Sequence, residues 1–235
     1  MTMLKKTRLV TMTALFALAA GHAVQAVAAA DQADVEAQRG RLLQIIKEVE
    51  SNPTELANAM AAGADRSLLC SNCHGKDGNS LQPETPNLAA QNPAFLLQQI
   101  EHFATGARKN FVMNSLASNF TKEDKVHLAV YFSNQALRPQ QVDPGLAARG
   151  KRLFESVCYL CHGADGKGGD EKGYARIAGQ RLDYVVKTLK RFRAVARKEV
   201  ETDEIVRDNP RMEQVTQNLN DADIEALANY VASLR

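Results

Sequence analysis

The chain has 235 residues, 45% of them hydrophobic and 24% charged, and its formal net charge is +2. These proportions are ordinary for a soluble globular protein of one or two domains, and they exclude a fibrous or disordered chain. The excess of positive charge lies within residues 1–30, where Lys5, Lys6 and Arg8 have no acidic counterpart. The remaining chain is about neutral, which argues against a nucleic-acid binder.

The N-terminus is typical of an export signal. Its basic residues precede an apolar run at 9–20, and the small residues at 26–30 offer cleavage sites. We therefore expect residues 1–30 to be a signal peptide and the mature protein to lie in the periplasm. The alternative is a retained anchor, because residues 9–30 carry no charge and are long enough to span a bilayer. An anchor would keep the protein peripherally associated with the membrane.

Two signals mark helix starts: a capping Asn or Asp followed by Pro, and a capping box in which Asp replaces the usual Glu or Gln. Apolar residues at helical spacing mark the helix bodies, and few segments alternate as strands do. We therefore predict an all-α fold. The helices are expected, in chain order, at about 34–50, after Asn52-Pro53, after 87–91, from Thr121 with Asp124, after Asp143-Pro144, over 182–196, and from Asn220 with Asp223.

Two short motifs contain every cysteine of the chain: CSNCHG at 70–75 and CYLCHG at 158–163. Positions i and i+3 share one side of a helical turn, so both cysteines of a pair can form thioethers with the vinyl groups of one haem. The next residue, His74 or His162, then becomes the proximal iron ligand. The motifs predict two covalently attached haem c groups. The attachment residues are Cys70, Cys73, Cys158 and Cys161.

Other uses of paired cysteines fit less well. Two CxxC pairs that share a zinc ion are usually about 15–20 residues apart, whereas Cys73 and Cys158 lie in different halves of the chain. A thioredoxin-like site requires one CxxC near a βαβ unit. Neither kind of site needs a histidine directly after each pair.

Each haem iron needs a sixth ligand, and methionine is scarce outside the N-terminal segment. Met60 precedes the first motif on a predicted helix, where core packing is its natural role. Met113 and Met212 each follow one motif, which predicts one methionine per haem. His102 and His127 are rival ligands for the first haem, although neither has a counterpart in the second half.

The two halves of the chain form an internal repeat. NLAAQ at 87–91 matches RIAGQ at 176–180, and both halves continue to an Ala-Arg-Lys tripeptide. The second half then carries ten extra residues, 199–208, before its methionine. We expect two domains, at 31–139 and 140–235, each with one haem.

These motifs, in this order, resemble the dihaem class I cytochromes c of the cytochrome c4 family. The resemblance covers most of the chain after the signal peptide, except for the extra helix and the insertion. It implies two tandem class I cytochrome c domains that carry single electrons. It also implies that the carbonyl of Pro86 supports the Nδ1 proton of His74. Ala175 stands at the matching place for His162, without the rigid turn of proline.

Basic residues suggest two further roles. Arg108 and Arg197, in the matching Ala-Arg-Lys tripeptides, are candidates to pair with haem propionates. The segment 187–198 contains six positive residues and no acid. It is either a solvated helix face or a docking surface for an acidic redox partner.

The expected function is electron transport between redox proteins. The resemblance implies a shuttle between a quinol-oxidising complex and a terminal oxidase or reductase. A variant is the electron-accepting subunit of a periplasmic dehydrogenase, with the helix at 34–50 as its partner surface. The enzyme alternative, a dihaem peroxidase, requires an iron with an open coordination site. One methionine per haem argues against it, so we expect a carrier without catalytic residues.

The two predicted sites differ, and unequal haem potentials follow. The first has Pro86 and a short approach to Met113, whereas the second has Ala175 and the insertion before Met212. A redox titration of the purified protein should therefore require two midpoint potentials. A curve that fits a single potential would contradict this expectation.

Overall fold

The computed structural model describes residues 36–200, 207 and 209–235. The predicted signal peptide and most of the 199–208 insertion lie outside the described residues. Contacts divide the chain into Met1–Arg41 and Leu42–Arg235, and all contacts considered below lie within the larger unit. Among the described residues, no helix is both long and apolar enough to cross a membrane.

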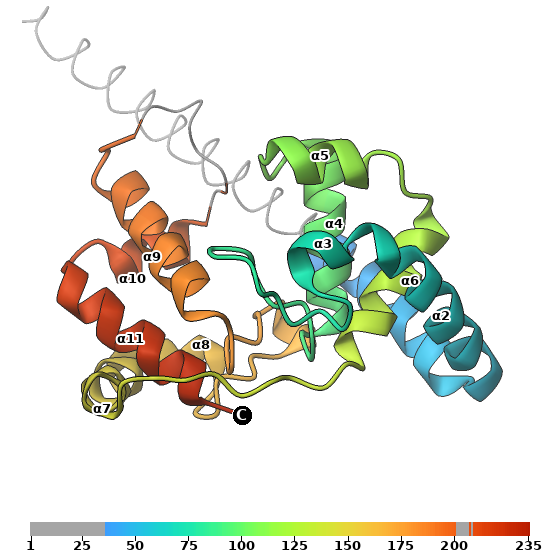
Figure 1. Ribbon diagram of the computed structural model, residues 1–235. Coiled ribbons are helices and arrows are strands. Elements are labelled where there is room, and N and C mark those ends of the chain that lie inside the picture. The colour runs from blue at the N-terminus through green and yellow to red at the C-terminus, as the bar shows by residue number, and fades with distance from the viewer. Residues whose placement is uncertain (1–35, 201–206, 208) are drawn as a thin grey trace, which may run out of the picture. The chain divides into compact units, whose positions relative to one another are not determined.

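The predicted all-α fold is confirmed (Figure 1). Two isolated bridges are the only β-type pairings of the described part of the chain. The elements are, in chain order, a helix over 36–51, α2 (Pro53–Arg66), η1 (Ser67–Leu69), α3 (Ser71–His74), α4 (Pro93–Thr105), α5 (Phe111–Ala117), α6 (Lys122–Ser133), α7 (Pro144–Leu153), a π-type turn η2 (Phe154–Cys158), α8 (Tyr159–His162), η3 (Asp170–Lys172), α9 (Leu182–Ala196), α10 (Pro210–Thr216) and α11 (Asp221–Ser233).

The first half has its own hydrophobic core, in which α2 and α4 both pack on α6. Leu97, Leu128 and Phe132 are buried at its centre. Ile46, from the predicted extra helix, is only 2% exposed and belongs to this core. The extra helix therefore contributes to the packing of the first half.

The second half repeats the arrangement around a second core. Here α7 and α9 pack on α11, as α2 and α4 pack on α6. Phe154 is fully buried, and its ring meets the ring of Tyr230 edge-on at 5.2 Å. Val185 and Leu227 complete the centre of this core.

The predicted helix starts are present. The Asn52 side chain accepts from the backbone N–H groups of the first turn of α2, and Asp143 does the same for α7. Complete capping boxes begin α6 and α11, so aspartate replaces glutamate in both without loss of the reciprocal bonds.

Two helix pairs, α2 with α6 and α7 with α11, each cross at a glycine. A Cβ added at Gly63 would lie 2.4 Å from the carbonyl oxygen of His127 on α6. A Cβ added at Gly150 would lie 2.0 Å from the carbonyl oxygen of Ala226 on α11. The two backbones therefore touch, and only glycine permits so close an approach.

Replacing Gly150 by alanine should destabilise the second half. The new methyl group would overlap the backbone of α11, so we expect the free energy of unfolding to fall by about 1–3 kcal/mol, measured by denaturant titration. Gly40→Ala is the matched control, because a Cβ added at this helical glycine meets nothing within 4 Å. Equal stability of the two variants would show that the crossing tolerates a side chain.

Candidate functional site

Each predicted proximal histidine lies at the end of a short helix and is held by a backbone carbonyl. Nδ1 of His74 lies 2.9 Å from the carbonyl oxygen of Pro86, and Nδ1 of His162 lies 3.0 Å from that of Ala175. A carbonyl oxygen only accepts, so Nδ1 carries the proton and Nε2 keeps its lone pair. Alanine thus makes the bond that the resemblance assigns to proline.

Both imidazoles are neutral and available as ligands. Burial lowers the pKa of His74 and of His162 below the ordinary value of 6.5. The positive charge of Arg108 acts in the same direction on His74, and that of Arg207 acts on His162. A neutral imidazole with a free Nε2 is the form that binds iron.

The glycine that ends each motif has a structural reason. Gly75 and Gly163 have φ angles of 77° and 76°, in the region that disfavours other residues. A Cβ added at Gly75 would lie 2.3 Å from the carbonyl oxygen of Asn79. The chain turns sharply here, and the turn leads it back to the carbonyl that holds the histidine.

Two of the cysteines, one in each motif, do not resemble reactive thiols. Burial raises the pKa of Cys70 and of Cys158 to about 11, so both remain protonated at neutral pH. A redox-catalytic thiol requires the opposite shift. Cys70 and Cys158 therefore lack the property that disulfide exchange requires.

The two methionines occupy the same place in equivalent helices. Met113 is the third residue of α5, and its N–H donates to the Asn110 side chain at 3.0 Å. Met212 is the third residue of α10, and its N–H donates to Asn209 at 3.1 Å. The insertion therefore lengthens the sequence before the second methionine, but the helix position and the capping bond of the methionine are the same in both halves. The rival His102 lies on α4, near two arginines.

One of these arginines is Arg108, which contacts both halves of the chain. Its guanidinium donates to Gln99 Oε1 at 2.8 Å and to the Tyr184 hydroxyl at 3.0 Å. It also lies 4.6 Å from the centre of the Phe103 ring. Its Nε is buried without a hydrogen-bond partner.

The other is Arg207, which the repeat analysis missed. Its backbone forms an antiparallel bridge with Arg108, and its guanidinium lies 5.7 Å from the Phe95 ring centre and 5.5 Å from that of Phe192. Burial and the charge of Arg108 lower the pKa of Arg207 to about 10. Among the described residues, no ion pair joins either arginine to a carboxylate.

Both residues are half-buried. A cation withdrawn from water without an anion is costly, so the pair fits a cofactor that carries carboxylates. Arg197, expected from the tripeptide, lies elsewhere: its side chain is exposed and donates to the carbonyl oxygens of Gln217 and Leu219. Arg108 and Arg207 precede Met113 and Met212 by equal distances in the sequence. That spacing is the signal that could have found Arg207.

The fold and the two histidine sites define a class I cytochrome c, and the Cytochrome c family model matches residues 147–235. Cytochrome c4 of Azotobacter vinelandii is 33% identical over 201 residues, which cover 77% of this chain and 93% of that protein. The chain therefore belongs to the cytochrome c4 family, and it is a dihaem electron-transfer cytochrome.

Two further similarities extend this result. The crystal structure of reduced cytochrome c4 from Pseudomonas stutzeri is similar with a TM-score of 0.65 and 32% identity, covering 75% of this chain and 98% of that one. The thiosulfate dehydrogenase electron acceptor of Thiomonas intermedia is 28% identical, covering 74% of this chain and 82% of that protein.

Removing the cap in front of Met113 should loosen its helix. Asn110→Ala deletes the acceptor for the Met113 N–H, at a cost of about 1 kcal/mol. We expect hydrogen exchange at this amide to become about fivefold faster. Asn119→Ala is the control, because Asn119 follows the C-terminal end of α5 and its side chain donates to the carbonyl oxygen of Ser115. Equal exchange rates in both variants would contradict the role of the cap.

Proposed function

We propose that this protein is a periplasmic electron carrier in which each haem iron is bound by one histidine and one methionine. The axial pairs are His74 with Met113 and His162 with Met212. The observation that carries the proposal is repeated in both halves: a histidine whose Nδ1 proton is held by a backbone carbonyl, and a methionine at the third position of a capped helix.

Covalent haem c is the cofactor of this family, and it supplies reversible one-electron chemistry. The thioether residues are Cys70, Cys73, Cys158 and Cys161. The chain's own contribution is to fix the imidazole orientation through the carbonyls of Pro86 and Ala175, and to keep both imidazoles neutral. A soft methionine ligand favours the ferrous state and raises the potential.

Arg108 and Arg207 are the proposed partners of the haem propionates, in place of the expected pair with Arg197. The support is the half-buried position of both residues, the unpartnered Nε of Arg108, and the effect of each arginine on the pKa of one proximal histidine. Arg197 instead braces the segment between α10 and α11.

The basic segment 187–198 suits a solvated face better than a docking surface. Four of its six cations have carboxylate partners. The ion pairs are Lys187 with Glu84, Lys190 and Arg193 with Asp221, and Arg197 with Glu199. Neutralised cations attract an acidic partner weakly, so this segment contributes little to long-range steering.

We propose two haem domains, at 31–139 and 140–235, and redox proteins as partners on both sides. The donor is a quinol-oxidising complex, and the acceptor is a terminal oxidase or reductase. A second candidate role, electron acceptor of a periplasmic dehydrogenase, is favoured by the similarity to the thiosulfate dehydrogenase electron acceptor.

Separate Met113→Ala and Met212→Ala variants test the ligation. Each should lose half of the long-wavelength ferric absorption band typical of methionine-bound haem, and the potential of the altered haem should fall because the thioether is lost. Met60→Leu is the control, because Met60 packs against the first core. Retention of the whole band in either alanine variant would refute that ligand pair.

A further inference from the structure

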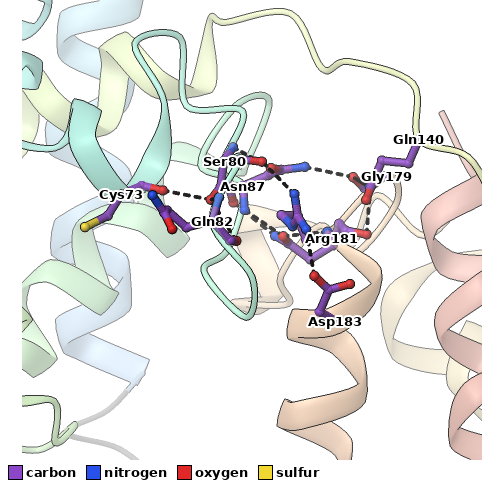
Figure 2. Close-up of polar contacts among 9 residues, drawn as sticks. Cys73, Ser80, Gln82, Asn87, Gln140, Gly179, Arg181 and Asp183 are labelled. Atoms are coloured by element: carbon purple, nitrogen blue, oxygen red, sulfur yellow. Dashed lines mark hydrogen bonds and ion pairs between the residues drawn. The ribbon is translucent and has the colours of Figure 1, made fainter.

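The glutamine at the end of each repeated NLAAQ or RIAGQ segment reaches into the other half of the chain. Gln180 is 8% exposed, and its Oε1 accepts from the Asn87 N–H at 2.7 Å. Its Nε2 donates to the Asn87 carbonyl oxygen at 3.0 Å. Figure 2 shows this region, with Asn87 close to Gly179 and Arg181 of the second half.

Gln91 makes the reciprocal contact. It is 7% exposed, and its Oε1 accepts from the Arg176 N–H at 2.7 Å, while its Nε2 donates to the Arg176 carbonyl oxygen at 2.7 Å. Asn87 and Arg176 are matching residues of the repeat. Each glutamine therefore binds the same backbone position of the opposite half.

This backbone position is directly linked to the proximal histidine. The N–H of Asn87 and the carbonyl of Pro86 belong to one peptide group, and that carbonyl accepts from His74 Nδ1. A continuous chain of hydrogen bonds thus runs from Gln180 through this peptide to His74.

An equivalent series of hydrogen bonds leads to the histidine of the second half. The N–H of Arg176 and the carbonyl of Ala175 form one peptide group, which accepts from His162 Nδ1 and donates to Gln91. Each series of hydrogen bonds begins at a glutamine of one half and ends at the histidine of the other half.

A peptide group bonded at both ends is polarised. When the glutamine Oε1 accepts a hydrogen bond from the peptide N–H, electron density in that peptide shifts toward its carbonyl oxygen. The carbonyl oxygen becomes a stronger acceptor, and burial of the peptide amplifies the effect. A stronger acceptor for the Nδ1 proton makes the imidazole a better electron donor. A better donor stabilises the ferric state and lowers the haem potential.

We propose that Gln91 and Gln180 are positioning residues that tune the haem potentials across the domain interface. Gln180 acts on the haem of His74, and Gln91 acts on the haem of His162. The proposal rests on the proposed histidine ligation. It makes each potential depend on contact between the two halves.

Neighbouring amides provide controls, because they bond to backbone carbonyls beside the two glutamine contacts without touching either polarised peptide. Gln140 donates to the carbonyl oxygens of Gly179 and Gln180, at 2.7 and 2.9 Å (Figure 2). Asn92 donates to those of Lys167 and Tyr174, at 3.0 and 2.9 Å. Gln140 supports the Gln180 segment from within the second half, and Asn92 joins the two halves. A role limited to holding these segments in place would make both residues equivalent to the two glutamines.

The test compares Gln180→Leu, Gln91→Leu and their double variant with Gln140→Leu and Asn92→Ala by redox titration of the haem-loaded protein. Gln180→Leu should favour reduction of one haem by about threefold, which is about 30 mV for one electron. Gln91→Leu should shift the other haem, and the double variant should shift both. The two controls should leave both potentials unchanged.

Proton NMR of the ferrous protein identifies which haem responds. In Gln180→Leu, the Nδ1–H resonance of His74 should move upfield because its hydrogen bond weakens, while that of His162 should stay in place. If Gln180→Leu fails to load haem, Gln180→Ser leaves room for a water molecule, and a smaller shift in the same direction is expected.

The proposal is overturned if both leucine variants move the same haem, if neither moves any potential, or if the controls produce equal shifts. Failure of the proposed ligation is recognised separately, from the absence of the methionine band in the unmodified protein. A normal band with unshifted potentials would reject the inference about the glutamines alone.

Discussion

The hydrogen bond from His74, and from His162, to a backbone carbonyl is the contact on which both sites depend. It fixes the tautomer, so that Nδ1 bears the proton and Nε2 keeps its lone pair. The sharp turn at Gly75 or Gly163 returns the chain toward that carbonyl. The acceptor is a backbone carbonyl, which every residue has, and so Ala175 can replace proline without loss of the bond.

The interface between the two halves concentrates polar and charged groups that proteins normally keep in water. Arg108 and Arg207 lie together among aromatic rings, and neither has a carboxylate partner in the part of the chain that the structure describes. Such an arrangement is costly for an empty site and favourable beside anionic groups. This arrangement is the reason for proposing that the two arginines pair with haem propionates.

Duplication explains why the interface is symmetric in its contacts. The same glutamine of each repeat reaches the same backbone position of the other, at 2.7 Å from Oε1 to the N–H nitrogen in both cases. The insertion in the second half interrupts the sequence match but not this symmetry. The insertion contains Arg207, whose backbone bridges to Arg108. Arg197 instead donates to the carbonyl oxygen of Gln217.

Local chemistry was readable from the sequence by itself: the haem motifs, the all-α fold, the capped helix starts and the repeat. The motifs and helix starts act within a few residues, through capping bonds and helical spacing. The repeat is recognised by comparing the two halves of the sequence, so none of these signals requires knowledge of a tertiary contact. The tertiary structure decided the glycine crossings at Gly63 and Gly150, the pairing of Arg108 with Arg207, and the exchanged glutamine bonds. Each of these joins residues far apart in the chain, and only the packing of helices determines which distant backbone a side chain meets.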